Sequence, residues 1–105
     1  MIKIYNKLVR DKIPEIIEKN GSRPKYHVAD DIEYLKALYK KIQEELQEFT
    51  ETPNIEEAAD LLETIFALCE FMGLDSQLIA NEITRKADEK GMFKERIILE
   101  SVEEQ

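Results

Sequence analysis

Cysteine, glycine, proline and tryptophan are all scarce in this chain. Its 105 residues include one Cys, three Gly, three Pro and no Trp. A single cysteine excludes a disulfide framework, and no apolar run is long enough to cross a bilayer. The first ten residues also lack the apolar stretch of a signal peptide. These absences predict a cytoplasmic protein without membrane contact.

Basic residues are in the minority as well. Fifteen Lys and Arg stand against 23 Asp and Glu, which gives a formal net charge of -8. A surface of this sign excludes a protein that binds a nucleic-acid polymer through its phosphate backbone. If the chain binds phosphates, we expect a cation to mediate. A hydrophobic share of 43% over this length predicts one globular domain, residues 1–105.

Residues that start and stop helices predict an all-α helical bundle with an extended C-terminal tail. Asp11 is expected to cap a short first helix, with Pro14 tolerated in its first turn. Asp30 or Asp31, Asn54 and Asp75 cap three longer helices. The expected helices are residues 11–20, 30–51, 54–73 and 75–91. In the tail, the β-branched run at residues 96–99 predicts either a short strand that pairs with residues 25–29 or a strap across the helices.

Acidic residues in the second expected helix differ in their direction. The buried stripe is expected to contain Leu35, Leu38, Ile42, Leu46 and Phe49. Glu44 points nearly opposite this stripe, at about 100° per residue. Glu45 lies only about 60° from its middle, and Glu48 is the i+3 neighbour of Glu45. Glu45 and Glu48 are therefore expected to converge at the edge of the buried face.

The third expected helix carries two acids on a face that otherwise looks buried. Glu56, Glu63 and Glu70 recur every seven residues and form the solvated stripe. Glu57 and Asp60 instead share a face with apolar residues. Buried carboxylates are costly unless they are protonated, paired or bound to a cation.

Four acids, Glu45, Glu48, Glu57 and Asp60, therefore form a candidate site for Mg²⁺ or Mn²⁺. The alternative is that a Glu-rich pair of helices only keeps the protein in solution.

Two motifs and both flanking segments resemble one protein family. EELQE at residues 44–48 and EAAD at residues 57–60 are similar to the EExxE and ExxD signature of the all-α nucleoside triphosphate pyrophosphohydrolases, the MazG-like superfamily. The segments YNKLVRDKIPEIIEKNG and KADEKGMFKERIIL resemble the opening and closing segments of a small phosphoribosyl-ATP pyrophosphohydrolase-like subgroup. The resemblance covers essentially the whole chain.

The resemblance implies an enzyme that hydrolyses the α-β phosphoanhydride of a nucleotide to a monophosphate and pyrophosphate. It implies Mg²⁺ at the same four acids and a dimer or tetramer. Glu44 or Glu45 is the candidate for orienting or deprotonating the attacking water. The chain departs from the family in a shorter hairpin between the two motifs, and in Lys90 where the subgroup often has Arg.

Basic side chains are the candidates for phosphate binding. Lys86 and Lys90 flank the expected inward stripe of Ile79, Ile83 and Ala87. Their alternative role is to cover apolar surface with their methylene stems. The second group comprises Lys7, Arg10 and Lys12, just before the start of the first helix. The alternative for this group is a structural ion-pair cluster with Asp11.

Three functions stay open at this point. The first is a Mg²⁺-dependent nucleotide pyrophosphohydrolase, in one version removing noncanonical nucleotides. The second is a phosphoribosyl-ATP pyrophosphohydrolase, and the third is a non-catalytic acidic helical oligomerisation module. In each case we expect a homodimer or larger homo-oligomer, because the third expected helix has more apolar circumference than one small bundle covers.

Overall fold

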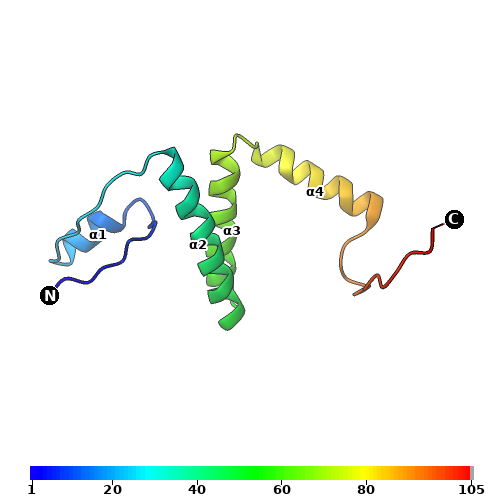
Figure 1. Cartoon of the computed structure of the whole chain (residues 1–105), viewed down its shortest axis with the longest axis horizontal. Helices are drawn as coiled ribbons and strands as arrows, with labels where there is room; N and C mark the ends of the chain where they lie inside the picture. The colour runs from blue at the N-terminus through cyan, green and yellow to red at the C-terminus, as the bar shows by residue number, and fades with distance from the viewer. Residues whose placement is uncertain (105) are drawn as a thin grey trace. The chain divides into compact units, whose positions relative to one another are not determined.

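The structure is a computed structural model that describes residues 1–104. Within this range the chain is all-α, with four α-helices and no strand (Figure 1). The helices are α1 (Ile13–Lys19), α2 (Asp31–Glu51), α3 (Ile55–Phe71) and α4 (Ser76–Lys90). The expected fold class, one short and three longer helices followed by an extended tail, is confirmed.

Two compact units divide the chain. The first is Met1–Gly73, with α1, α2 and α3, and the second begins at Leu74 and contains α4. The expectation of a single domain over residues 1–105 stays a prediction. No helix in the described part of the chain is long and apolar enough to cross a membrane.

Side-chain caps start the three longer helices where the sequence places them. The Asp30 carboxylate accepts from the Glu33 amide at 2.9 Å, and the Asn54 carbonyl oxygen accepts from the Glu57 amide at 2.8 Å. Asp75 caps α4 in the same way. These bonds satisfy amides that the first turn of a helix leaves without a partner.

The first helix starts one residue later than expected. Lys12, not Asp11, is the N-cap residue of α1, and no side chain caps it. The reason is a turn before the helix, in which the Ile13 amide donates to the Arg10 carbonyl at 3.1 Å. Pro14 does lie in the first turn, as expected. The helix ends before Gly21, whose φ of 89° suits glycine.

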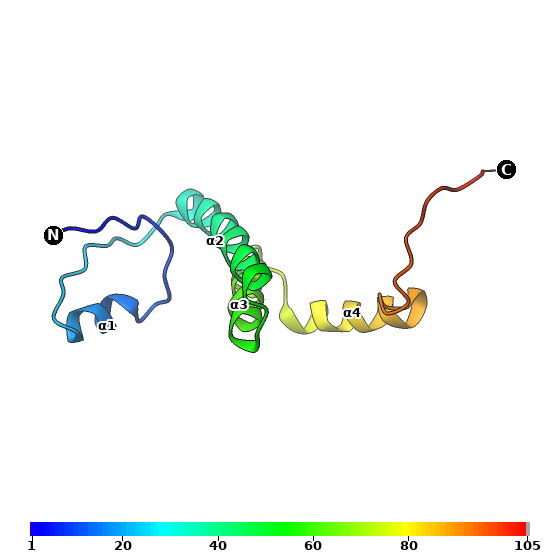
Figure 2. The ribbon, with the colours of Figure 1, turned by 90° about the horizontal axis from the view of Figure 1, so that it is seen from below.

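The core of the first unit is the hairpin of α2 and α3. A connection of three residues, 52–54, forces the two helices to run antiparallel, and both views show them side by side (Figures 1 and 2). Tyr34 near the start of α2 meets Phe71 at the end of α3 edge to face, with 5.1 Å between ring centroids. Leu38 is 1% exposed. This packing fixes which faces of the two helices meet.

One residue of each expected buried stripe is exposed within its own unit. Leu46 on α2 is 52% exposed, whereas Leu35, Ile42 and Phe49 of the same stripe are half-buried. On α4, Ile79 and Ala87 are partly buried but Ile83 is 66% exposed. Periodicity identifies the apolar side of a helix, whereas burial also needs another element to cover that side.

The C-terminal tail forms no strand up to residue 104. Residues 91–104 are all exposed, and their one backbone turn has the Arg96 amide donating to the Phe93 carbonyl at 3.3 Å. Of the two alternatives for residues 96–99, the short strand is therefore wrong, and the strap across the helices stays a prediction. An isolated β-branched run needs a neighbouring strand to complete its hydrogen bonds, and the described residues offer none.

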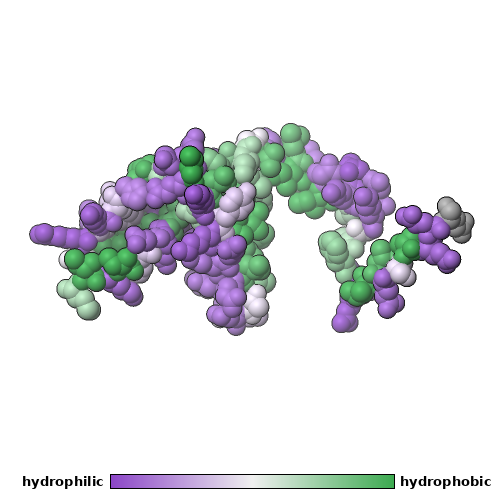
Figure 3. All heavy atoms as spheres, viewed as in Figure 1, coloured by the Kyte–Doolittle hydropathy of each residue, from purple (hydrophilic) through white to green (hydrophobic). Residues whose placement is uncertain are grey.

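Large apolar side chains are abundant on the surface of the first unit. Leu62, Ile65 and Phe66 on α3 are 53%, 37% and 51% exposed. Figure 3 shows apolar residues gathered along one side of α3. Apolar side chains gathered on one side of a helix in this way are typical of a face that another surface covers.

Candidate metal centre

Glu45 is the most deeply buried charged residue among those the structure describes. It lies on α2, and only 7% of its surface is exposed. Its Oε1 atom is 3.4 Å from the ammonium nitrogen of Lys41, one helical turn earlier. Its Oε2 atom is buried and has no hydrogen-bond partner in the described part of the chain. Burying a carboxylate with one unpaired oxygen costs folding free energy, and a ligand bound to this oxygen would offset that cost.

Two acids of α3 complete a group of three carboxylates. Glu57 and Asp60 are half-buried, and they and Glu45 each offer an oxygen within 4.8 Å of the other two. The Asn54 cap fixes Glu57 in the first turn of α3, and Asp60 follows three residues later. Glu57 Oε2 is also buried without a partner. The sequence prediction that these residues converge across the hairpin is confirmed for these three.

Glu48 and Glu44 lie at the margins of this group. Glu48 is exposed and contributes no oxygen to the group of three. It is nevertheless close enough for its charge to act on Glu57. Glu44 is half-buried and lines a separate hollow beside the N-terminal segment. The two neighbours Glu44 and Glu45 therefore belong to different environments.

The environment of Glu57 opposes its negative charge. Loss of solvation raises the pKa of Glu57, and the nearby charges of Glu48, Asp60 and Glu45 raise the pKa further. A divalent cation would reverse these effects, because it would stabilise the ionised forms of all these groups.

Arg10 contacts the acidic group from the N-terminal segment. One guanidinium nitrogen is 2.7 Å from Asp60 Oδ1, and the other pairs with Glu63. Hydrogen bonds to Asp60 and Glu63 raise the pKa of Arg10. Arg10 was expected to bind substrate or to pair with Asp11. The structure places it on two acids of α3, where it anchors the segment before α1.

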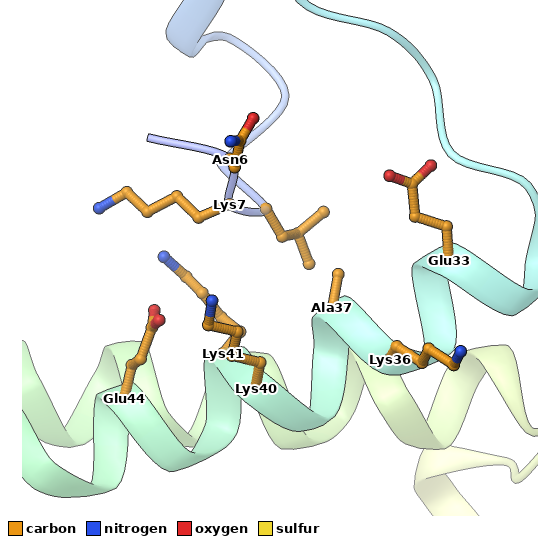
Figure 4. Close-up of a pocket in the computed structure, with 9 residues that line it drawn as sticks. Asn6, Lys7, Glu33, Lys36, Ala37, Lys40, Lys41 and Glu44 are labelled. Atoms are coloured by element: carbon orange, nitrogen blue, oxygen red, sulfur yellow. The ribbon is translucent and has the colours of Figure 1, made fainter. Parts of the chain in front are cut away.

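Lysines of α2 and the N-terminal segment line a hollow of about 200 Å³. Its charged and polar lining residues are Asn6, Lys7, Glu33, Lys36, Lys40, Lys41 and Glu44. In Figure 4 the side chains of Lys7, Lys40 and Lys41 extend toward the Glu44 end of the hollow, whereas Lys36 extends the other way. Lys7 was expected among the phosphate-binding residues, and it lies here with three lysines of α2.

The other predicted phosphate-binding residues lie elsewhere. Lys12 is exposed at the start of α1 and outside the hollow. Lys86 and Lys90 are exposed on α4, in the second unit. For these three residues a role in binding stays a prediction.

Lys36, Lys40 and Lys41 were not among the residues predicted from the sequence to bind a ligand. Lys41 stands four residues before Glu45, a spacing at which side chains on a helix meet, so its ion pair with Glu45 could have been predicted from the sequence. The hollow could not have been predicted in this way, because it depends on where the N-terminal segment lies against α2.

The residues of this site fit a hard divalent cation. Glu45, Glu57 and Asp60 supply only oxygen atoms, as Mg²⁺ and Mn²⁺ prefer. The two unpartnered oxygens of Glu45 and Glu57 are the atoms that such an ion would satisfy.

Comparisons with protein-family models, with curated proteins and with solved structures find no match to this chain.

Replacing Glu57 by Gln is predicted to stabilise the protein in a chelator at about pH 7. The folded-state pKa of Glu57 is raised above the ordinary value of 4.5, so ionisation costs stability as pH rises from that value through the raised pKa. Below 4.5 both states are protonated and the advantage of Glu57→Gln disappears. Urea unfolding of both proteins across this pH range measures the difference.

Glu70→Gln, on the solvated side of α3, is the control for charge alone. Added Mg²⁺ is expected to stabilise the wild-type protein more than Glu57→Gln. An advantage of Glu57→Gln that is independent of pH and equal to that of Glu70→Gln would contradict the account of this site.

Proposed function

We propose that this chain is a Mg²⁺-dependent nucleotide pyrophosphohydrolase, which converts a nucleoside triphosphate and water to a monophosphate and pyrophosphate. The observation that carries the proposal is the buried, unpartnered oxygen of Glu45 among the carboxylates of Glu57 and Asp60. The resemblance of residues 44–48 and 57–60 to the EExxE and ExxD signature supports the same activity. Membership of the MazG-like superfamily is part of the proposal.

Glu45, Glu57 and Asp60 would hold the ion, with Glu48 at the exposed side. When bound there, Mg²⁺ supplies positive charge that neutralises phosphate oxygens and lowers the pKa of a nearby water. Mn²⁺ has the same ligand preference and is expected to substitute.

Glu44 and Glu45 are the two candidates for accepting the proton of the attacking water. Glu44 lines the hollow and has no ion-pair partner among the described residues. Glu45 belongs to the acidic cluster. In the proposed reaction a water oxygen attacks the α-phosphorus, and the bond from that phosphorus to the bridging oxygen breaks. One of these two carboxylates accepts the proton of the water, and pyrophosphate leaves with the bridging oxygen.

The exposed apolar surface of α3 supports a homodimer or larger homo-oligomer as the working form. Leu62 and Phe66 are each about half exposed, and Leu38 is the only side chain in the described range that is fully buried. A second copy of the chain would cover such a surface by an isologous contact. This association is also what a purely structural oligomerisation module requires, so the enzyme assay must decide between the two functions.

Loss of one cluster carboxylate is predicted to abolish turnover. Glu45→Gln and Asp60→Asn should each lower kcat/KM by at least about a hundredfold, because each removes a charge that would hold the ion at the reacting phosphate. Pyrophosphate release from canonical and modified nucleoside triphosphates and from phosphoribosyl-ATP, with Mg²⁺ or chelator, is the measurement.

The control is Glu70→Gln, which removes one charge from α3 outside the cluster and should retain wild-type turnover. The best substrate of the panel would separate a nucleoside triphosphatase from a phosphoribosyl-ATP pyrophosphohydrolase. No metal-dependent release from any of these substrates would contradict the proposed activity, and would favour the non-catalytic module.

Light scattering tests the oligomer separately. We predict a mass of at least twice that of one chain at micromolar concentration, and a shift toward the monomer in Leu62→Glu/Phe66→Glu, since burying two carboxylates opposes association. A wild-type protein that is monomeric throughout this range would be the contrary result.

A further inference from the structure

The hollow beside α2 has a positive lining in a protein of net negative charge. Four lysines and two glutamates line it, while the whole chain carries a net charge of -8. One of the glutamates, Glu33, has its carboxylate hydrogen-bonded to the His27 ring at 2.9 Å. The lining is therefore biased toward anions.

Three of the lysines have no carboxylate within ion-pair distance in the described part of the chain. These are Lys7, Lys36 and Lys40; only Lys41 is paired, with Glu45. Lys7 also lies 5.7 Å from the ring centroid of Tyr5. Glu44 is the one carboxylate on the side of the hollow toward which Lys7 and Lys40 extend, so positive charge is in excess there and an anion would offset it.

The hollow adjoins the carboxylate cluster through one side chain. Lys41 lines the hollow and has its ammonium nitrogen 3.4 Å from Glu45 Oε1. Figure 4 shows Lys7, Lys40 and Lys41 near the Glu44 carboxylate, which precedes Glu45 in the chain. An anion at this end would lie next to the residues that fit a cation.

The size of the hollow limits what it can hold. A volume of about 200 Å³ is below the roughly 300–1,000 Å³ of sites that enclose a whole drug-sized ligand. The lysine ammonium group is a compact point charge, which suits the highly charged oxygens of a phosphate group. The hollow thus suits one end of an anionic ligand rather than a complete nucleotide.

We propose that this lysine-lined hollow binds the terminal phosphates of a polyphosphate, with Lys7 and Lys40 as the principal contacts and Lys41 between them and Glu45. The inference rests on the proposed function, because it assigns the diphosphate end of the substrate to the hollow and the scissile end to the acidic cluster. Inorganic pyrophosphate and a nucleoside triphosphate share the recognised chemistry.

The test is calorimetric binding of inorganic pyrophosphate, with Mg²⁺, to the full chain. Lys7→Gln/Lys40→Gln should weaken binding about tenfold and make it less sensitive to salt, because two point charges near the anion are lost. The control, Lys19→Gln/Lys25→Gln, makes the same change in net charge outside the hollow and should alter affinity less than about twofold. Circular dichroism checks that helicity is retained, and the single variant Lys40→Gln gives a smaller change in the same direction.

Binding and turnover distinguish the two proposals. If the wild-type protein turns over a nucleotide but Lys7→Gln/Lys40→Gln binds pyrophosphate as tightly as the control double variant, the hollow assignment is overturned and the proposed function stands. Lysine-dependent pyrophosphate binding without turnover of any nucleotide would support the hollow and contradict the enzyme. Absence of pyrophosphate binding to the wild-type protein, or orthophosphate binding at least as tight, would overturn the hollow as a polyphosphate site.

Discussion

Burial of the Glu45 carboxylate between α2 and α3 is the constraint on which the rest of the first unit depends. An ionised carboxylate removed from water requires compensation, and Lys41 provides it for only one of the two oxygens. The antiparallel hairpin places Glu57 and Asp60 opposite, and Arg10 pairs with Asp60 but leaves the charges of Glu45 and Glu57 close together. A protein that only needed stability would be better served by apolar residues at these positions. The arrangement is physically reasonable if a cation completes it.

Adjacent residues on α2 divide the site into regions of opposite charge. Consecutive positions on a helix differ by about 100°, so Glu44 and Glu45 face different neighbours. Glu45 joins the acidic cluster, and Glu44 joins the lysine-lined hollow. Arg10 ties the N-terminal segment to Asp60 on α3, while Lys7 of the same segment lines the hollow. One short segment thus contacts both regions, and the proposed ligand, which carries phosphates together with a divalent ion, would use both.

Local signals in the sequence predicted the helix boundaries and the acidic cluster well. Cap residues such as Asn54 act within one turn, and periodicity alone placed Glu57 and Asp60 on a burying face. Most of what failed depended on tertiary contacts. The exposure of Leu46 reflects the lack of a covering element within the first unit. The hollow was invisible for the same reason, because its two walls are far apart in the sequence. The displaced cap at Asp11 is a different case, because it results from a local backbone turn before α1.

The central claim is that the three carboxylates hold a divalent ion. Anomalous X-ray diffraction from crystals of the full chain grown with Mn²⁺ locates such an ion directly. The account predicts a peak within about 2.0–2.6 Å of oxygens from Glu45, Glu57 and Asp60. Mn²⁺ bound only at exposed acids such as Glu56 or Glu70, with none between α2 and α3, would contradict it.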